Sequence, residues 1–435
     1  MLNIIIFNKR LQKIEMLIGH YFRIIGFFEI RINKTISWIK SPNLNHQIKD
    51  LGKNANKINI TFIDTDFAVG GAQKVTLDIV KALPKNRFKS AFIATECFGL
   101  KKNWQNKFNE AFDDLIDMRM TRNKKVKLLK VLSLLRPDII VIVNSKVAYS
   151  VVSKIKEESP KTFLIDIIHG IFGSRYEKVL TFECIENLDK RIAICDGLRK
   201  EVLRNYKNKG SIFNYEEKVI CIRNGTDIHP NDIVEIEFSY RNYFNIPHNA
   251  FVVLFVGAIA HHKNPLSLID MAKIIKQTND VHFLLVGEGP LEKRVNYEIS
   301  KNDLSEMVHI AGYSDNVSKI LLESDILILP SKVESMGLVI LEAMARGKPT
   351  IVANVGFQSE IIQNNINGLL VEGNKKMAGN FVKNILRLKN DHYFYEWIKR
   401  NALIKVEEEF DVDDSVKRYI NVFEDVSCAR KTILQ

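Results

Sequence analysis

Two glutamates eight positions apart, Glu334 and Glu342, stand in the part of the chain with the clearest potential for chemistry. They belong to the stretch DILILPSKVESMGLVILEAMARGKPT, which runs from Asp325 to Thr350. A carboxylate can accept hydrogen bonds from two hydroxyl groups, such as those of a sugar or ribose diol. Alternatively, Glu334 complements the dipole of its own helix and Glu342 is an ordinary solvated helix residue. Taken alone, the two residues leave both interpretations open.

The residues around the glutamates predict a strand, a loop and a helix. The apolar run 326–329 is closed by Pro330, as in a buried strand that ends at a sheet edge. Gly337 precedes a new apolar period over 338–345, which indicates a helix that ends at Gly347. In open α/β sheets such junctions bind ligands, because the free N–H groups and the dipole at the helix start attract anions.

Paired glycines and a lysine offer a second and a third candidate for binding anions. Gly70 and Gly71 lie between a predicted strand over 57–65 and an amphipathic helix, and glycines allow a backbone to approach a phosphate or sugar closely. The pattern is not G-x-G-x-x-G, so a dinucleotide fingerprint is unsupported, and a plain tight turn is the alternative. Lys263 precedes the predicted helix 265–276 as a cation suited to phosphate, or else as a solvated surface residue.

A histidine follows another predicted strand. The apolar run 163–168 ends at His169, and the carboxyl end of a parallel strand is where ligands are contacted. An isolated histidine is, however, more often structural than catalytic.

Strands and helices alternate in two successive series, which predicts the fold class α/β. Two such series imply two Rossmann-like βα domains that face a cleft. We assign residues 58–228 to an N-terminal domain and 246–400 to a C-terminal domain, with a helix at about 410–426 that packs back on the first. Predicted strands are 57–65, 90–95, 138–143, 163–168, 191–195, 219–222, 251–256, 281–286, 308–311, 326–329, 350–353 and 368–371.

Residues 1–57 differ from the rest in charge. The 435-residue chain carries a formal net charge of +12, and these residues hold ten Lys/Arg against three Asp/Glu. Apolar residues recur at helical spacing between Ile14 and Phe28, as in a basic amphipathic helix that lies on an anionic membrane. Alternatively, this helix packs on the protein or on a second subunit. Nucleic-acid binding is disfavoured, because the excess elsewhere is only +5 and no aromatic-basic stripe is present.

Cysteine usage and hydropathy favour a cytoplasmic location. The five cysteines show no C-x-x-C spacing, which argues for a reducing compartment and against a disulfide framework or a zinc site. No segment has eighteen uninterrupted apolar residues, and no tripartite signal opens the chain.

The motifs taken in order resemble a known family, the retaining glycosyltransferases of the GT-B fold, family 4 (glycosyl transferases group 1). The resemblance covers about residues 58–425, and its most specific part is the sequence ESMGLVILEAMA, which matches the family signature of two glutamates separated by seven residues. The accompanying motifs are GGAQKV at 70–75, HG at 169–170, RNGTD at 223–227, FVGAIAHHKN at 255–264, LLVGEGP at 284–290, HIAGY at 309–313 and NGLLV at 367–371.

The resemblance implies that 58–228 is the acceptor-side domain and 246–400 the nucleotide-sugar-binding domain, and it implies roles for the candidate residues. Glu334 would contact the hydroxyls of the donor sugar, Glu342 the ribose, and Lys263 the diphosphate, with His169 near the reacting carbon. The nucleobase would rest against the loops after the strands 281–286 and 308–311. Backbone N–H groups would assist Lys263, and they come from Gly337 and Leu338 and, across the cleft, from Gly70 and Gly71.

Two positions depart from the family pattern. Ala258 stands where the family often has an arginine, which leaves one cation against the diphosphate. Phe357 replaces the usual second glycine before the loop glutamate, Glu360, and this narrows the expected sugar pocket.

The resemblance therefore implies a retaining, metal-independent hexosyltransferase that needs no cofactor and uses a nucleotide-diphosphate sugar as substrate. Its acceptor would be a glycan or lipid-linked hydroxyl in cell-envelope polysaccharide synthesis, at the inner face of the cell membrane. The alternatives are a soluble sugar-phosphate or disaccharide synthase of the same fold, or a catalytically silent binding subunit.

Overall fold

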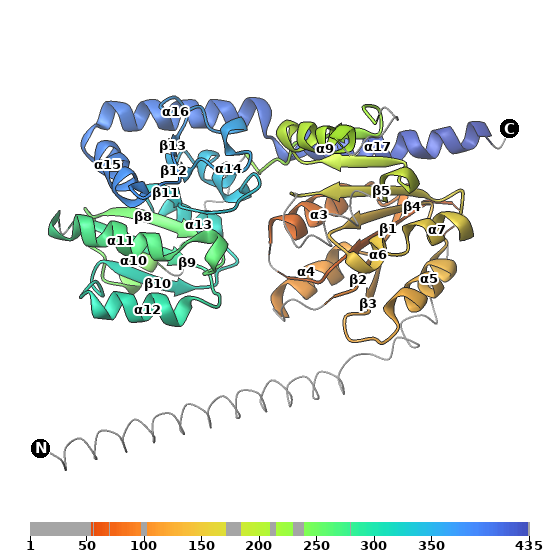
Figure 1. The fold of residues 1–435 in the computed structure, drawn as a ribbon, viewed down its shortest axis with the longest axis horizontal. Helices are drawn as coiled ribbons and strands as arrows, with labels where there is room; N and C mark the ends of the chain where they lie inside the picture. The colour runs from red at the N-terminus through yellow and green to blue at the C-terminus, as the bar shows by residue number, and fades with distance from the viewer. Residues whose placement is uncertain are drawn as a thin grey trace, which may run out of the picture.

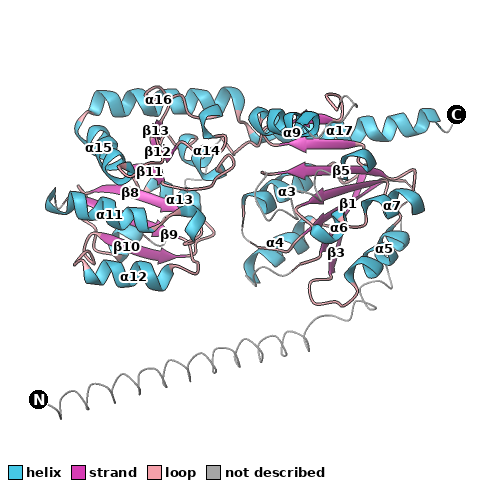
Figure 2. Cartoon of the chain, in the orientation of Figure 1, coloured by secondary structure: helices cyan, strands magenta, loops and turns pink. Residues whose placement is uncertain are grey.

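The computed structural model describes Asn54 and residues 56–68, 70–96, 102–170, 184–208, 215–228, 239–278 and 280–433. The amphipathic helix predicted between Ile14 and Phe28 lies outside these residues. Two parallel sheets, each flanked by helices, lie side by side (Figures 1 and 2). The predicted pair of Rossmann-like units is therefore confirmed.

The first sheet has seven strands in the order β3-β2-β1-β4-β5-β6-β7. Its central strand β4, with the sequence IIVIV, is buried along its whole length, as expected for a strand covered on both faces. The short edge strand β3 (DLID) was not predicted, because its two apolar residues give no periodic signal. The strands are β1 (Ile58–Asp64), β2 (Phe88–Ala94), β3 (Asp114–Asp117), β4 (Ile139–Val143), β5 (Phe163–Ile168), β6 (Lys190–Ala193) and β7 (Val219–Cys221). The helices are α3 (Gly71–Ala82), α4 (Lys102–Ala111), α5 (Lys124–Leu135), α6 (Lys146–Tyr149), α7 (Val152–Glu158) and α9 (Asp196–Asn208).

The second sheet has six strands in the order β10-β9-β8-β11-β12-β13. The strands are β8 (Phe251–Val256), β9 (Val281–Val286), β10 (Val308–Gly312), β11 (Ile326–Leu329), β12 (Thr350–Ala353) and β13 (Leu369–Val371). The helices are α10 (Tyr240–Tyr243), α11 (Leu266–Ile275), α12 (Glu292–Lys301), α13 (Val317–Leu322), α14 (Leu338–Met344) and α15 (Met377–Asn390), with 3₁₀ turns η2 (His261–Lys263) and η4 (Gln358–Glu360). Strand β11 leads directly to Glu334, and α14 carries Glu342.

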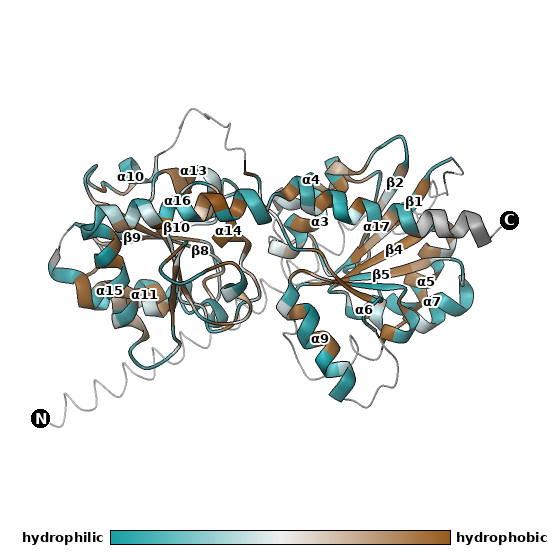
Figure 3. Cartoon of the chain, turned by 90° about the horizontal axis from the view of Figure 1, so that it is seen from above, coloured by the Kyte–Doolittle hydropathy of each residue, from teal (hydrophilic) through white to brown (hydrophobic). Residues whose placement is uncertain are grey.

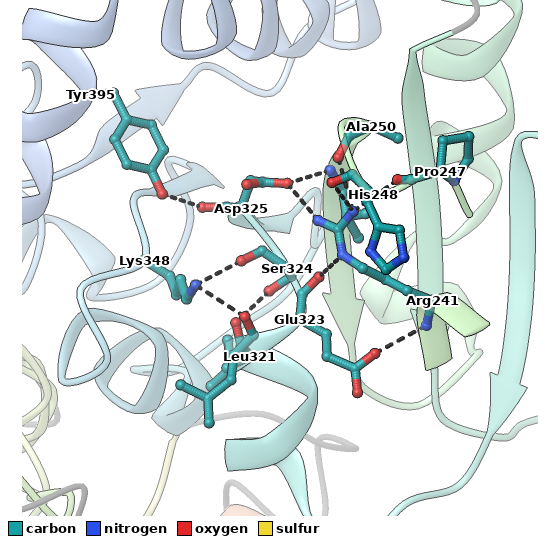
Figure 4. Close-up of polar contacts among 12 residues, drawn as sticks. Arg241, Pro247, His248, Ala250, Leu321, Glu323, Ser324, Asp325, Lys348 and Tyr395 are labelled. Carbon is teal, nitrogen blue, oxygen red and sulfur yellow. Dashed lines mark hydrogen bonds and ion pairs between the residues drawn. The ribbon is translucent and has the colours of Figure 1, made fainter. Parts of the chain in front are cut away.

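A polar cluster fixes the amino end of β11 (Figure 4). The carboxylate of Asp325 pairs with Arg241 at 3.1 Å and accepts a hydrogen bond from the backbone N–H of Val252 at 2.6 Å. Arg241 also donates to the carbonyl of Glu323 at 2.8 Å, and Tyr395 donates to the carbonyl of Asp325 at 2.9 Å. These bonds tie the entry of the second domain to the strand that carries the glutamate loop.

The C-terminal helices connect the two units. Helix α16 (His392–Glu409) lies over the second domain and α17 (Val412–Ile433) lies along the first (Figure 1). At the crossing, the N–H of Thr226 donates to the carbonyl of Phe410 at 2.8 Å. Further along α17, the ring of Phe423 is fully buried 6.3 Å from the ring of Phe62 in β1.

Apolar residues concentrate in the sheets. In the view coloured by hydropathy, strands β4 and β5 of the first domain are mostly apolar, whereas polar residues are frequent on the surrounding helices (Figure 3). Each sheet thus holds the core of its own domain, and the carboxyl ends of the strands remain for polar chemistry.

Candidate active site

The loop between β11 and α14 owes its shape to two glycines. Gly337 begins the helix in a left-handed conformation with φ of 77°, where a β-carbon is disfavoured. Gly356, with φ of 62°, packs so closely under the loop that a β-carbon there would lie 2.0 Å from the carbonyl oxygen of Glu334. Only glycine fits at Gly356, and the neighbouring Phe357 N–H donates to the carbonyl of Ser335 at 3.0 Å.

Glu334 forms an ion pair with Lys263. The Nζ of Lys263 bonds to Oε2 of Glu334, and their side chains are only 19% and 11% exposed. Glu334 also accepts from the N–H of Ser335 at 3.2 Å. Its carboxylate therefore does not simply complement the start of α14, as the alternative interpretation held.

The loop that carries Lys263 is bonded to the glutamate loop at two further points. Asn264, which has a left-handed φ of 54°, donates from Nδ2 to the carbonyl of Pro330 at 3.1 Å. The carbonyl of His262 accepts from the N–H of Lys332 at 2.8 Å. Burial and the adjacent Lys263 lower the pKa of His262, so this histidine is neutral at pH 7.

Glu342 faces the first domain. Its Oε1 lies 3.9 Å from Nζ of Lys74 in α3, and its side chain is 16% exposed, so it is not a solvated helix residue. Burial raises the pKa of Glu342 against the opposing effect of Lys74. Burial alone would lower the pKa of Lys74, but the carboxylates of Asp78 and Glu342 outweigh burial and raise it.

The paired glycines of the first domain lie at this same junction. A β-carbon on Gly71 would be 3.2 Å from Cδ1 of Leu338, the first residue of α14. Gly70 is the N-cap of α3, and a β-carbon there would be 2.7 Å from Oε1 of Gln73. The amino-terminal ends of α3 and α14 thus meet, and the structure brings Gly70, Gly71, Leu338 and Glu342 together.

His169 stands at the end of β5, as predicted. Burial lowers its pKa to about 4, so the ring is neutral at pH 7. Its Nε2 is buried and has no hydrogen-bond partner among the described residues. Within the described residues, no hydrogen bond or ion pair links His169 to Lys263 or Glu334. Buried polar atoms normally have partners, and an orphaned one at a strand's carboxyl end is suited to receive a ligand hydroxyl.

Two serines of the glutamate loop were not singled out from the sequence. The hydroxyls of Ser331 and Ser335, on either side of Glu334, are buried and find no hydrogen-bond partner in the described part of the chain. Serines are common in turns, so nothing in the sequence marked these two hydroxyls as available.

The domains also meet at polar contacts that the sequence did not reveal. Asp196 and Gly197 are the first residues of α9 in the first domain. Their backbone N–H groups donate to the carboxylate of Glu360 in the second domain at 3.0 and 2.5 Å. The indole of Trp104 donates to Asp315 at 3.0 Å, again between domains. The motif around Glu360 was recognisable, but its partner lies more than 160 residues away in the chain.

Two features are absent from the described residues. Across the described ranges, no group of three or more His, Cys, Asp or Glu side chains is arranged to hold a metal ion. None of the helices in that part of the chain is both long and apolar enough to cross a membrane.

Comparison with known proteins agrees with this geometry. Residues 237–406 match the family "Glycosyl transferases group 1". The chain is 26% identical over 412 residues, 85% of this chain and 98% of the relative, to the Escherichia coli UDP-Gal:alpha-D-GlcNAc-diphosphoundecaprenol alpha-1,3-galactosyltransferase. It is also 26% identical over 247 residues, 56% of this chain and 61% of the relative, to the Bacillus anthracis N-acetyl-alpha-D-glucosaminyl L-malate synthase.

Solved structures share the fold. Anabaena HepE in complex with UDP and glucose superposes with a TM-score of 0.71 at 19% identity, over 85% of this chain and all of HepE. The sucrose-phosphate synthase of Thermosynechococcus elongatus superposes with a TM-score of 0.68 at 17% identity, over 86% of this chain and all of the synthase.

Two parallel-sheet domains, with a glutamate-bearing loop of one opposite a glycine turn of the other, define an enzyme of the GT-B class. The protein is a glycosyltransferase, and its residues 237–406 match the family of glycosyl transferases group 1.

Proposed function

We propose that the protein is a retaining glycosyltransferase that moves a hexose-type sugar from a nucleotide-diphosphate sugar to a hydroxyl of a lipid-linked or polysaccharide acceptor. The observation that carries the proposal is the largely buried pair of Lys263 and Glu334, at a junction that also holds Gly71 and Glu342. The Escherichia coli relative, whose name specifies a UDP-sugar and a diphosphoundecaprenol-linked acceptor, supports the substrate classes.

The donor is oriented with its nucleotide on the second domain. In this proposal the second domain, 246–400, holds the nucleotide, with the nucleobase against the loops after β9 and β10 and the ribose on Glu342. The diphosphate lies at Lys263, which the backbone N–H groups of Gly337 and Leu338 at the start of α14 assist. The first domain, 58–228, presents the acceptor.

The remaining contacts serve the sugar and the reacting carbon. Gly70 and Gly71 approach the donor from the first domain, and their lack of side chains leaves room for it. Glu334 accepts hydrogen bonds from the sugar hydroxyls, and the neutral ring of His169 offers Nε2 to another hydroxyl near the anomeric carbon.

Donor binding requires an exchange of partners at Lys263. In the structure its ammonium group is bonded to Glu334. A diphosphate carries more negative charge than one carboxylate and therefore competes for the ammonium group. Glu334, released from the pair, then turns its oxygens to the sugar. Binding of phosphate and binding of sugar are thus coupled through one ion pair.

The reaction needs charge stabilisation more than an enzymic nucleophile. As the bond between the anomeric carbon and the phosphate oxygen breaks, its electron pair moves to the diphosphate, and positive charge grows on the sugar. Lys263 and the preorganised N–H donors stabilise the first charge, and Glu334 the second. The acceptor oxygen bonds to the anomeric carbon from the side that the phosphate leaves, and its proton passes to the departing phosphate. The configuration is retained, and the proposal assigns no step to a metal.

The proposed location follows from the acceptor. A lipid-linked acceptor is met at a membrane, so we place the protein in the cytoplasm at the inner face of the cell membrane, in cell-envelope polysaccharide synthesis. The basic residues between positions 1 and 57 suit an anionic lipid surface.

A panel of nucleotide-diphosphate sugars tests the donor site by protection against thermal unfolding. A ligand at 100 times its Kd stabilises a protein by about 2.7 kcal/mol, which is measurable as a rise in Tm. We expect one or a few nucleotide-diphosphate sugars to raise the Tm, and Lys263→Ala to reduce that rise. The corresponding nucleoside, which lacks phosphates, is the control. No protection by any member, or equal protection of the Lys263→Ala variant, contradicts the proposal.

A further inference from the structure

Helix α5 and its flanks carry a strong local excess of positive charge. Residues 118–137 contain seven Lys/Arg and no Asp/Glu. Two of the seven have partners, since Arg119 pairs with Asp117 at 2.7 Å and Lys124 donates to the carbonyl of Thr95 at 2.5 Å. The other five are Arg122, Lys125, Lys127, Lys130 and Arg136, and four of them are exposed while Lys127 is half-buried. We call these five the basic face.

The basic face has no compensating acidic residues. None of its five side chains forms an ion pair or hydrogen bond with another residue in the described part of the chain. Elsewhere on the surface such pairs are frequent, as between Arg294 and Glu298 at 2.6 Å in α12. The five uncompensated charges are therefore available to an anionic partner.

Two apolar side chains are exposed beside these charges. Val126 is 69% and Leu134 is 37% exposed. They are not needed for the core, because the opposite side of α5 already packs inward through Leu128, Val131, Leu132 and Leu135. A helix with basic residues and exposed aliphatic residues on its outer side suits the boundary of an anionic bilayer, where charge and apolar area both contribute to binding.

Both ends of α5 lie against strands of the first sheet. At one end, the bond from Lys124 to Thr95 holds the start of α5 beside the carboxyl edge of the first sheet, where the acceptor is proposed to enter. At its other end, Leu135 shares a small recess with Asn59 and Ile60 of β1. Strand β1 directly follows residues 1–57, so the basic segment joins the domain next to α5.

We propose that the outer side of α5, with its basic face, Val126 and Leu134, is a docking surface for an anionic lipid bilayer. It extends the proposed function, in which the acceptor is lipid-linked, but it rests on charge and exposure that are independent of catalysis. The exposed aliphatic residues favour lipid over a nucleic acid. The side also has no aromatic residue on which a base could stack.

Vesicle binding by the full chain tests the surface. Binding to phosphatidylcholine vesicles with and without phosphatidylglycerol is measured by cosedimentation for wild type and for K125E/K127E/K130E. Each basic residue near an anionic surface contributes about 1 kcal/mol, so the triple variant should bind anionic vesicles at least about tenfold more weakly. K375E/K376E/K383E changes the net charge equally on exposed lysines of the second domain and should bind as wild type does.

The outcomes separate this surface from the catalytic proposal. Unchanged binding by K125E/K127E/K130E, an equal loss in the control variant, or equal wild-type binding to neutral vesicles overturns the docking surface. K125Q/K127Q/K130Q, which only removes charge, should give an intermediate loss and shows that the effect is electrostatic. A wild type that binds anionic vesicles but transfers no sugar contradicts the proposed function and leaves the docking surface standing.

Discussion

Replacing Lys263 by alanine should affect turnover far more than folding. In the ligand-free protein its ammonium group bonds to Glu334, and both side chains are largely but not fully buried. Such a partly solvated pair contributes about 1 kcal/mol or less to stability, so the Tm should fall only slightly. In the transition state the same ammonium group would face the developing charge of the leaving diphosphate. The loss of one such donor costs about 3 to 4 kcal/mol, or a factor of about 100 to 1,000 in kcat.

The assay is steady-state release of the nucleoside diphosphate with the donor found in the panel. Lys332→Ala is the matched control, because Lys332 is an exposed lysine of the neighbouring loop that takes part in the local bonding only through its backbone. It should keep wild-type turnover. If Lys263→Ala kept full turnover, or lost turnover only in proportion to lost folded protein, the assignment of Lys263 to the diphosphate would be refuted.

Three further predictions concern the domain junction and the core of the first domain. Glu360→Ala removes a carboxylate that accepts hydrogen bonds from two N–H groups of the other domain. Without a bound ligand, the two domains of this variant should open, and small-angle X-ray scattering should show a larger radius of gyration. An unchanged radius counts against this contact. Gly71→Val places a side chain against Leu338 and should raise the KM for the donor by tenfold or more, while retention of the wild-type KM would show that the glycine is dispensable. Burial raises the pKa of the Asp64 carboxyl to about 8. The folded state therefore holds a proton on Asp64 that the unfolded state releases above about pH 4. Because of this difference, the free energy of unfolding decreases as the pH rises from about 4 toward about 8. Asp64→Asn should therefore raise the Tm relative to wild type by an amount that grows between pH 4 and pH 8, and a difference that does not change with pH contradicts the cause.

Much of the fold followed from hydrophobic pattern because most strands are central and buried. Strands such as β5, β8 and β9 are continuous apolar runs between turn residues, and their predicted bounds were correct. Strand β3 was missed because it is a short edge strand whose terminal aspartates hide its two apolar residues. Hydrogen bonding to β2 stabilises the extended conformation of β3, which the local sequence alone does not predict.

The candidate site followed from sequence only where its parts are local. The order of loop, Gly337 and helix placed Glu334 and Glu342 correctly relative to each other. The partners could not be predicted, because the pairs of Glu334 with Lys263 and of Glu360 with α9 join residues far apart in the chain. Such contacts depend on how the sheets and domains pack, and no pattern along the chain records that.

The stereochemical course of donor cleavage tests the central claim most directly. With the nucleotide-diphosphate sugar selected by the thermal panel, wild-type protein is followed by proton NMR at early times, before the free sugar mutarotates. We predict that the first sugar released or transferred keeps the anomeric configuration of the donor, also in the presence of a metal chelator, and that Glu334→Gln abolishes the signal. An inverted product, a strict requirement for a divalent metal, or full activity of Glu334→Gln would contradict it.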